Sequence, residues 1–207
     1  MTTRTSLSHP LQIAEVSAPG AKGAIGITFC PGKKQASAMS GVWNRDLGLD
    51  LDTIKAWGAS AIITLIESHE IRDLEVEGID EQTGRRGIEW LHMPITDVSA
   101  PDERFAKAWR QHGARLIDRV RAGDRVLVHC KGGLGRAGTV AALMLVELGT
   151  RPEEAIRSVR KVRKGAIETR EQEGYIHAHA GRQVIDKALE PGTEGGSISL
   201  VHRQGCL

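Results

Sequence analysis

Residues 129–139, HCKGGLGRAGT, combine a thiol, closely spaced glycines and a guanidinium group in one short segment. Glycine tolerates backbone conformations in which successive N–H groups turn inward and form a nest for an anion. Arg136 offers a planar fork that suits two phosphate oxygens. Cys130 lies six positions earlier, where Arg136 and the positive end of a following helix would favour the thiolate over the thiol. The segment therefore predicts a cysteine nucleophile that attacks a phosphate ester.

The loop after this cysteine is predicted to bind the phosphate. Its residues are Lys131, Gly132, Gly133, Leu134, Gly135 and Arg136. His129 is predicted to orient and stabilise the thiolate rather than to act as a base. No Gly-Lys-Ser/Thr follows the glycines, so the segment is not a Walker A loop. A lone buried cysteine at a strand end is usually a small apolar residue. Here the complete pattern, between a strand and an apolar helix, favours the catalytic interpretation.

The elements that must position this loop alternate between strands and helices. Short apolar runs predict strands at 24–29, 61–66, 88–95 and 125–129. Helices are predicted near Asp50, from Ser68, after the capping-box sequences Ser99-Ala-Pro-Asp102 and Thr150-Arg-Pro-Glu153, over the apolar run VAALMLVEL, and over 169–189. This order predicts an α/β fold with a mainly parallel central sheet flanked by helices. Ligands of such sheets bind beyond the carboxyl ends of the strands.

The domain organisation is predicted to be simple. One cysteine-phosphatase domain is expected over 24–189, and no internal repeat is visible. The Ser/Thr/Pro/Gly-rich residues 1–23 are predicted to be a loose N-terminal leader. Residues 190–207, which include a Gly/Ser-rich stretch, are predicted to be a flexible C-terminal tail.

Composition narrows the class of partner and the compartment. The net charge of +2 is too small to indicate a nucleic-acid partner. Three distant cysteines without a CxxC pair argue against a disulfide framework and against a metal site, and favour a reducing compartment. Cys30 is read as a structural thiol. The longest apolar runs are too short to span a bilayer, and no signal-peptide core is visible. We expect a cytoplasmic protein with no metal, no cofactor and no membrane partner.

Several stretches of the chain are similar to a known family. HCKGGLGRAGT resembles the signature of the protein tyrosine phosphatase superfamily. MPITDVSAPD and GAIETREQEGYI resemble its dual-specificity branch, especially the family of the cyclin-dependent-kinase-associated phosphatase, also named cyclin-dependent kinase inhibitor 3. The resemblance covers roughly residues 24–188 and implies a dual-specificity-phosphatase-like fold and a phosphocysteine intermediate. It also implies that Asp97 is the general acid and that Gln172 positions the water of the second step. Asp102 is the rival acid, but its place three residues after Ser99 favours a capping role.

One position departs from the family pattern. The residue after the loop arginine is usually Ser or Thr there, and its hydroxyl assists the departing thiolate. Here it is Ala137, with Thr139 two residues further along the chain. No tyrosine precedes the signature, which favours a shallow, dual-specificity site.

The sequence predicts a protein phosphatase that acts on phosphotyrosine, phosphoserine or phosphothreonine in a phosphorylated protein substrate. One alternative is a phosphatase for a phosphoinositide or an RNA 5′-phosphate. Another is a low-activity, phosphoprotein-binding pseudophosphatase, which is compatible with the missing hydroxyl at Ala137. A sulfurtransferase would not be expected to need Arg136 or Asp97. The basic stretch 157–165 is either a solvated helix face or a rim that attracts an acidic phosphopeptide.

Overall fold

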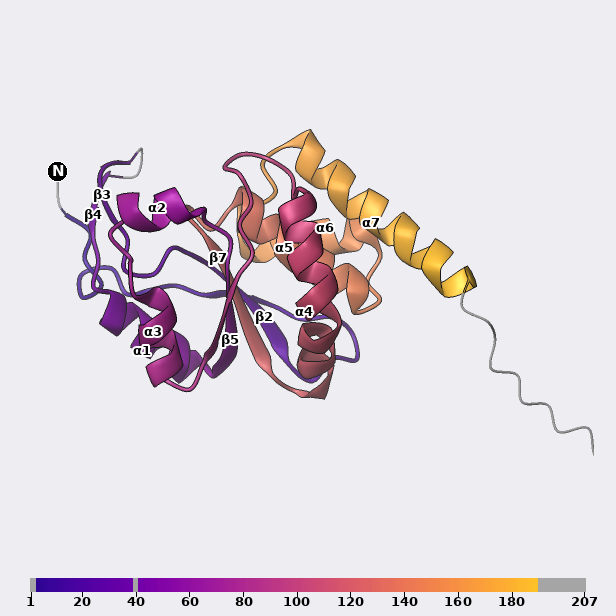
Figure 1. The fold of residues 1–207 in the computed structure, drawn as a ribbon, viewed down its shortest axis with the longest axis horizontal. Coiled ribbons are helices and arrows are strands. Elements are labelled where there is room, and N and C mark those ends of the chain that lie inside the picture. The colour runs from indigo at the N-terminus through magenta and orange to yellow at the C-terminus, as the bar shows by residue number, and fades with distance from the viewer. Residues whose placement is uncertain (1–2, 39–40, 190–207) are drawn as a thin grey trace, which may run out of the picture.

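The computed structural model describes residues 3–38 and 41–189, and its centre is a five-stranded sheet (Figure 1). The strand order is β1-β2-β7-β5-β6. The bounds are β1 Ala14–Val16, β2 Ala24–Phe29, β5 Ala59–Thr64, β6 Glu89–His92 and β7 Arg125–Cys130. The pairs β2–β7, β7–β5 and β5–β6 are parallel, and only β1 runs antiparallel to its neighbour. This confirms the predicted α/β fold with a mainly parallel sheet.

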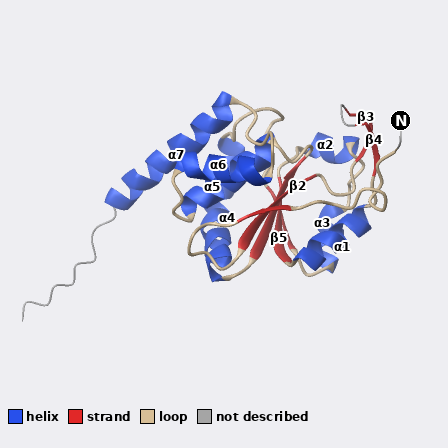
Figure 2. Ribbon diagram, turned by 180° about the vertical axis from the view of Figure 1, so that it is seen from behind, coloured by secondary structure: helices blue, strands red, loops and turns tan. Residues whose placement is uncertain are grey.

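Helices cover both faces of the sheet (Figure 2). Helices α1 (Leu47–Trp57) and α3 (Ile79–Arg85) lie on one face. On the other face lie α4 (Glu103–Ala122), α5 (Gly135–Glu147), α6 (Pro152–Val162) and α7 (Arg170–Leu189), while the short α2 (Ser68–Asp73) follows β5. Successive side chains of a strand point to opposite faces, so Ile62 of β5 joins the apolar cluster under α1 and Ile63 joins the larger cluster under α5.

The central strand β7 and the helix that follows it hold the signature segment. Residues 126–130 of β7 are all buried, and so are residues 135–146 of α5. An element that is apolar on all sides packs in the interior, which is the environment predicted for this helix. The four-residue connection between them, 131–134, therefore lies at the carboxyl edge of the sheet, with its two ends fixed in the core.

The N-terminal segment differs from the prediction. Residues 3–23 are not a loose leader, because β1 pairs with β2 and the side chains of Leu11 and Val16 are buried. Arg4 N–H also donates to the carbonyl of Val42, 2.9 Å away. The local sequence gave no sign of these contacts because their partners lie far along the chain. The proposed domain bounds stay a prediction, and the predicted tail over 190–207 lies outside the described residues.

A small hairpin, β3 (Lys34–Ala38) with β4 (Gly41–Asn44), and the helix α3 were not predicted. Helix α1 also begins earlier than expected. Its N-cap is Asp46, whose side chain accepts a hydrogen bond from Leu49 N–H. Asp50 instead lies buried against Arg45, with Oδ2 2.7 Å from Nε. Asp50 is therefore the buried partner of an ion pair and not a helix cap. A capping pattern in the sequence cannot reveal such a pairing.

The start of α4 corrects the predicted capping box. Asp102 is itself the N-cap, because its Oδ1 accepts hydrogen bonds from the N–H groups of Arg104 (3.0 Å) and Phe105 (3.2 Å). Ser99 remains outside the helix, in the preceding loop. In the same way α6 begins at Pro152 with Arg151 as its N-cap, one residue after the predicted Thr150. Both capping-box sequences mark a helix start, but the capping residue is shifted.

The described part of the chain contains no helix that is both long and apolar enough to cross a bilayer. Within the same residues, no cluster of three or more His, Cys, Asp or Glu side chains is arranged to hold a metal ion. His177 and His179 contact two different glutamates, Glu153 and Glu147.

Candidate active site

Cys130 is the last residue of β7 and lies at the base of the connection to α5. Its side chain is 3% exposed, and the N–H group of Gly133 donates to its sulfur at 3.2 Å. The backbone thus folds back over the thiol within three residues. We call residues 130–136 the nucleophile loop. Its position at the N-terminus of α5 places the positive end of that helix next to the sulfur.

The glycines of the nucleophile loop act in different ways. Gly133 has φ of +68°, and a Cβ there would lie 2.4 Å from the carbonyl carbon of Thr28. It therefore serves both as a left-handed residue and as a close contact to β2. A Cβ on Gly135 would lie 2.3 Å from Glu168 Oε2, so this glycine permits close packing only. A Cβ on Gly132 would meet nothing within 4 Å. Only Gly133 is needed for the curled backbone that the sequence suggested for all three.

Arg136 is almost completely buried and is held from several sides. Its Nη1 donates to Glu70 Oε2 at 2.6 Å and to the carbonyl of Ile95 at 3.1 Å. Its Nη2 donates to Glu70 Oε1 at 3.0 Å and lies 2.8 Å from Asp97 Oδ1. The buried Nε has no partner among the described residues. A buried N–H donor without an acceptor is costly, so this atom marks a place where an anion can bind.

Glu70 of α2 is a functional candidate that sequence reasoning missed. Burial is the largest single influence and would raise the pKa of Glu70, but the hydrogen bonds from Arg136 and Glu67 and the positive charges of Arg136 and Lys131 together lower it. Burial alone would likewise lower the pKa of Arg136, and the bonds to Glu70 raise it instead. The two groups therefore remain charged and form a bidentate pair. Glu70 lies in an ordinary polar helix sequence, SHEIRD, so no local signal could have singled it out.

Two further cations bind the outward-facing carbonyls of the nucleophile loop. Arg163 Nε donates to the carbonyl of Gly133 at 3.0 Å, and its Nη2 donates to that of Gly132 at 3.1 Å. Lys33 Nζ donates to the carbonyl of Lys131 at 3.3 Å. With the carbonyls fixed outward, the N–H groups of the same peptides are free to face an anion inside the loop.

These contacts also resolve the basic stretch 157–165 into two parts. Arg163 reaches the nucleophile loop, and Arg160 donates to the carbonyls of Ala166 and Ile167. The residues at 157, 161 and 164 are exposed, as a solvated face would be. Two other arginines, Arg85 and Arg86, contact groups of α1 and α3 instead of this site.

His129 is buried, and it lies beneath the loop in a hydrogen-bonded chain. Its Nε2 is 2.8 Å from the hydroxyl of Thr64, which also accepts a hydrogen bond from Trp90 Nε1 at 2.8 Å. Burial is the main reason that the pKa of His129 is lowered to about 3. The imidazole is therefore neutral at physiological pH, and its contacts favour an orienting role.

Asp97 belongs to a loop over 95–102, here called the acid loop, which lies across Arg136. The Asp97 side chain is 56% exposed, and its contact with Arg136 Nη2 brings it to the edge of the candidate anion site. The next residue, Val98, has φ of +60°, a strained conformation for a β-branched side chain. Arg104 Nη2 donates to the Thr96 hydroxyl at 2.9 Å and ties this loop to α4.

Gln172 is buried, not on an exposed helix face. Its Oε1 accepts a hydrogen bond from Glu168 N–H at 2.8 Å, and its Nε2 donates to the carbonyl of Ser99 at 3.2 Å. It therefore links the turn before α7 to the acid loop. A Cβ on Gly135 would come within 2.9 Å of Gln172 Nε2, so the amide packs against the start of α5.

The structure shows whether Ala137 or Thr139 can offer a free hydroxyl group near the loop. Ala137 is fully buried and carries no hydroxyl. Thr139 Oγ1 donates to the carbonyl of Gly135 at 2.8 Å, one turn back in the same helix. This hydroxyl is therefore engaged by the backbone of α5.

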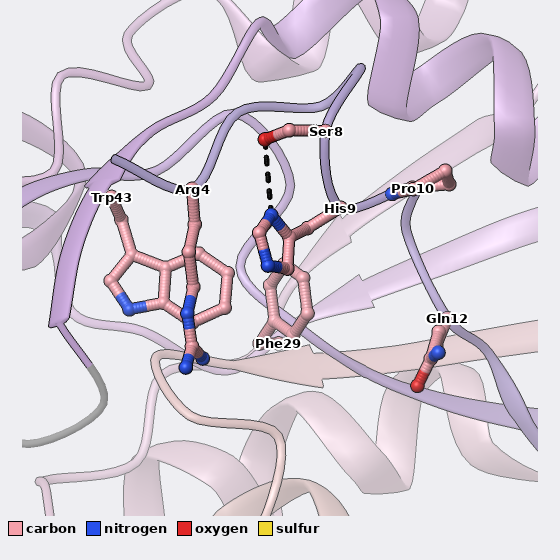
Figure 3. Close-up of a pocket in the computed structure, with 7 residues that line it drawn as sticks. All are labelled: Arg4, Ser8, His9, Pro10, Gln12, Phe29 and Trp43. Atoms are coloured by element: carbon pink, nitrogen blue, oxygen red, sulfur yellow. Dashed lines mark hydrogen bonds between the residues drawn. The ribbon is translucent and has the colours of Figure 1, made fainter. Parts of the chain in front are cut away.

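A pocket of about 330 Å³ lies on the β2 side of the nucleophile loop (Figure 3). Phe29 and Trp43 form two of its walls, and Arg4 extends over the Trp43 ring, with its Cζ 5.1 Å from the ring centroid. His9 contributes an imidazole whose Nδ1 is 3.0 Å from the Ser8 hydroxyl. The pocket does not include Cys130 and is separate from the anion site.

The residues predicted from sequence are thus brought together around one small space. It contains a thiol with an amide donor, an unpaired guanidinium N–H, a helix N-terminus and a carboxyl group at the rim. This arrangement suits binding of a tetrahedral oxyanion, nucleophilic attack by sulfur, and proton transfer at the edge.

Comparison with known proteins finds phosphatase relatives of this chain. The sequence profile of a family described as "Swiss Army Knife protein, DSP-PTPase phosphatase domain" matches residues 38–176. Cyclin-dependent kinase inhibitor 3 of Rattus norvegicus is 32% identical over 136 residues, which are 64% of this chain and 63% of the rat protein. Protein tyrosine phosphatase type IVA 3 of Homo sapiens is 30% identical over 68% of this chain and 75% of its own length.

Solved structures agree with the sequence comparison. The crystal structure of kinase-associated phosphatase, with its catalytic site cysteine substituted by serine, superposes with a TM-score of 0.73. It is 27% identical in sequence, and the match covers 84% of this chain and 97% of that one. The chain spans just under two thirds of the length of the rat relative.

The Arg136–Glu70 pair yields a prediction about stability. Glu70→Leu should lower the free energy of unfolding at pH 7 by roughly 3 kcal/mol, because it leaves a buried guanidinium without its main counter-charge. The ionised Glu70 contributes stability above its ordinary value of 4.5, and this contribution is lost as the pH falls through its lowered folded pKa. The difference between wild type and Glu70→Leu should therefore shrink in acid. Urea unfolding at several pH values measures it.

Glu81→Leu is the matched control, since Glu81 pairs with Arg85 on an exposed helix surface. It should cost less than about 1 kcal/mol. The double variant Glu70→Leu/Arg136→Met should regain much of the loss, because it removes the unpaired charge. Equal effects of Glu70→Leu and Glu81→Leu would contradict the assigned role of the pair.

Proposed function

This chain belongs to the DSP-PTPase phosphatase family, and we propose that it removes phosphate from a phosphorylated protein through a phosphocysteine on Cys130. The single observation that carries the proposal is that the Cys130 sulfur accepts the Gly133 N–H and interacts electrostatically with buried Arg136, whose Nε has no partner among the described residues. A protein substrate is favoured because one relative is named a protein tyrosine phosphatase. We propose phosphotyrosine, phosphoserine or phosphothreonine as the substrate residue. The cytoplasm is the proposed compartment, because a thiolate nucleophile needs reducing conditions.

The first step forms the covalent intermediate. The Cys130 thiolate attacks phosphorus, the S–P bond forms, and the P–O bond to the substrate breaks. Arg136 and the N–H groups of the nucleophile loop hold the three remaining phosphate oxygens. Asp97, at the rim of this site, gives its proton to the departing alkoxide or phenoxide. The products of this step are the free hydroxyl of the protein substrate and phosphocysteine.

The second step regenerates the thiolate. A water molecule attacks phosphorus, its proton passes to the Asp97 carboxylate, and the S–P bond breaks to release inorganic phosphate. Gln172 is the proposed positioning residue for this water, because its amide lies between the start of α5 and the acid loop. It must exchange its bond to the Ser99 carbonyl for one to water when it does so.

Cys130→Ser should abolish turnover of an aryl phosphate, since a serine hydroxyl in this loop is too weak an acid to supply the nucleophile. Vanadate should compete with substrate in the wild-type protein. EDTA should leave the rate unchanged, because no proposed step uses a metal. Unfolding curves of both proteins control for loss of the fold. Substantial hydrolysis by Cys130→Ser would refute the phosphocysteine mechanism.

Asp97→Ala should lower kcat on alkyl phosphates by roughly 10²–10⁴-fold and remove the alkaline limb of the kcat profile, because the leaving group then lacks a proton donor. Asp102→Ala is the control. It should leave kcat unchanged and lower the stability by about 1 kcal/mol, since Asp102 caps α4. Steady-state kinetics across pH measures both. Greater sensitivity of kcat to Asp102→Ala would reverse the assignment.

Because Ala137 has no hydroxyl group, we expect breakdown of the phosphocysteine intermediate to limit the rate of turnover. A hydrogen bond to the departing thiolate would be worth about 1.5–3 kcal/mol, or roughly 10–100-fold in rate. Wild type should therefore release the alcohol in a burst followed by slow turnover, and Ala137→Ser should raise the steady rate and shrink the burst. Rapid-quench kinetics measures this.

Thr139→Ala is the control for that experiment, and it should leave the burst unchanged, because its hydroxyl is bonded to Gly135. Absence of a burst in wild type, together with a burst in Thr139→Ala, would assign the hydroxyl to Thr139.

The wild-type protein should hydrolyse phosphopeptides in preference to a phosphoinositide or an RNA 5′-phosphate. The opposite preference would leave the mechanism intact and replace the proposed substrate class.

A further inference from the structure

Lys33 is an ammonium group held in the interior of the protein. The residue is 4% exposed, and no carboxylate of the described residues forms an ion pair with it. Its Nζ lies 4.3 Å from the ring centroid of Trp43 and 5.1 Å from that of Phe29. These rings are the two aromatic walls of the pocket in Figure 3. Burying a cation without an anionic partner destabilises a fold, so a retained one calls for a function.

The only hydrogen-bond acceptor recorded for this ammonium group in the described structure is in the nucleophile loop. Lys33 Nζ donates to the carbonyl of Lys131, the residue directly after Cys130. Arg163 binds the next two carbonyls, so the backbone oxygens at 131, 132 and 133 all face cations. Lys33 differs from Arg163 in one respect. An ammonium group can lose its proton in a buried site, whereas a guanidinium group stays charged.

We propose that Lys33 is a positioning and electrostatic residue of the nucleophile loop, one that strengthens binding of the phosphate dianion only while it carries its proton. In that state it holds the Lys131 carbonyl outward and adds positive charge near the anion. Once it is neutral, the charge is lost and the anion binds less tightly. The inference rests on the proposed phosphate-binding role of the loop.

The surroundings of Lys33 set the pH at which this happens. Burial is the main cause that lowers the pKa of Lys33 from 10.5 to about 8, and the charges of Arg45 and Lys131 act in the same direction. Negative charge on the sulfur of Cys30 or Cys130 would oppose them. Burial raises the pKa of Cys30 well above its ordinary value, so this thiol stays neutral. Arg45 is paired with Asp50.

A bound dianion favours the protonated ammonium group. Its affinity is therefore greatest below pH 8 and falls as the pH rises through that value. If the anion raises the pKa of Lys33 by about one unit, its affinity should fall about fivefold between pH 7 and pH 9. Binding near pH 8 should also take up a proton from the buffer.

The test uses tungstate, a phosphate analogue that stays a dianion across this range, and the full chain carrying Cys130→Ser. The serine removes titration of the thiolate, so no turnover is needed. Isothermal titration calorimetry in buffers of different ionisation enthalpy gives both the affinity and the number of protons taken up. Adding Lys33→Met should weaken binding about tenfold at pH 7 and remove its dependence on pH. Adding Lys33→Arg should restore tight binding at pH 7 and keep it at pH 9.

Two controls separate Lys33 from its neighbours. Lys34→Met removes the adjacent but exposed lysine, which pairs with Glu75, and should change neither affinity nor proton uptake. Lys131→Met should lower the affinity but retain the fall between pH 7 and pH 9. Thermal unfolding of each variant shows that it is folded.

Tungstate binding that is tight at pH 7 and unchanged at pH 9, without proton uptake, would overturn the inference and leave the proposed function intact. No tungstate binding at any pH would count against the anion-binding loop itself. A fall with pH that persists in a folded Lys33→Met protein would assign the titration to another group and would also overturn the inference.

Discussion

The buried charge of Arg136 is the constraint on which the site depends. A guanidinium group in the interior must be neutralised, and Glu70 from α2 supplies two parallel hydrogen bonds for this purpose. The same side chain binds the carbonyl of Ile95, so it also anchors the first residue of the acid loop. Because Glu70 uses only the two terminal nitrogens, Nε is left without a partner among the described residues. Arg136 of α5 thus contacts both α2 and the acid loop, while its Nε–H group remains unpaired in the described part of the chain.

The orientation of the peptides in the nucleophile loop is a second consequence of charge. Amide N–H groups can face an anion only when their carbonyls point away from it, and each carbonyl then needs a partner of its own. Arg163 at the end of α6 and Lys33 in the turn after β2 provide those partners, and the Cys30 N–H also donates to the carbonyl of Lys131. Gly133 allows the turn itself, since a side chain there would collide with β2. The loop is therefore preorganised by groups that do not touch the substrate.

How much of this could be predicted depends on how local each feature is. The nucleophile loop was recognisable because Cys130 and Arg136 lie within one turn, between a strand and an apolar helix. The parallel sheet followed from short apolar runs separated by helices. Glu70 and Lys33 escaped prediction because each meets the loop only after distant segments have packed together. Asp102 was correctly favoured as a cap, but Ser99 was wrongly taken as the first residue of that cap. Two polar residues three apart satisfy the same pattern, and only the backbone geometry chooses between them.

The acid loop is arranged so that substrate binding can change the partner of its carboxyl group. In the described structure Asp97 lies against Arg136 Nη2, a donor that a bound phosphate would also use, while Nε next to it is unpaired. In the proposed mechanism, a phosphate that takes both donors frees Asp97 from its guanidinium contact, and Asp97 must then take up a proton before it can protonate the leaving oxygen. The strained backbone at Val98 sits directly beside this exchange. A carboxyl group that is exposed, held by one ion pair and adjacent to a strained residue can move at little cost, whereas Glu70, buried and bonded to both Nη1 and Nη2, cannot. In the proposed mechanism, the division between one fixed and one movable carboxylate would allow Arg136 to be both a partner in a structural ion pair and a phosphate ligand.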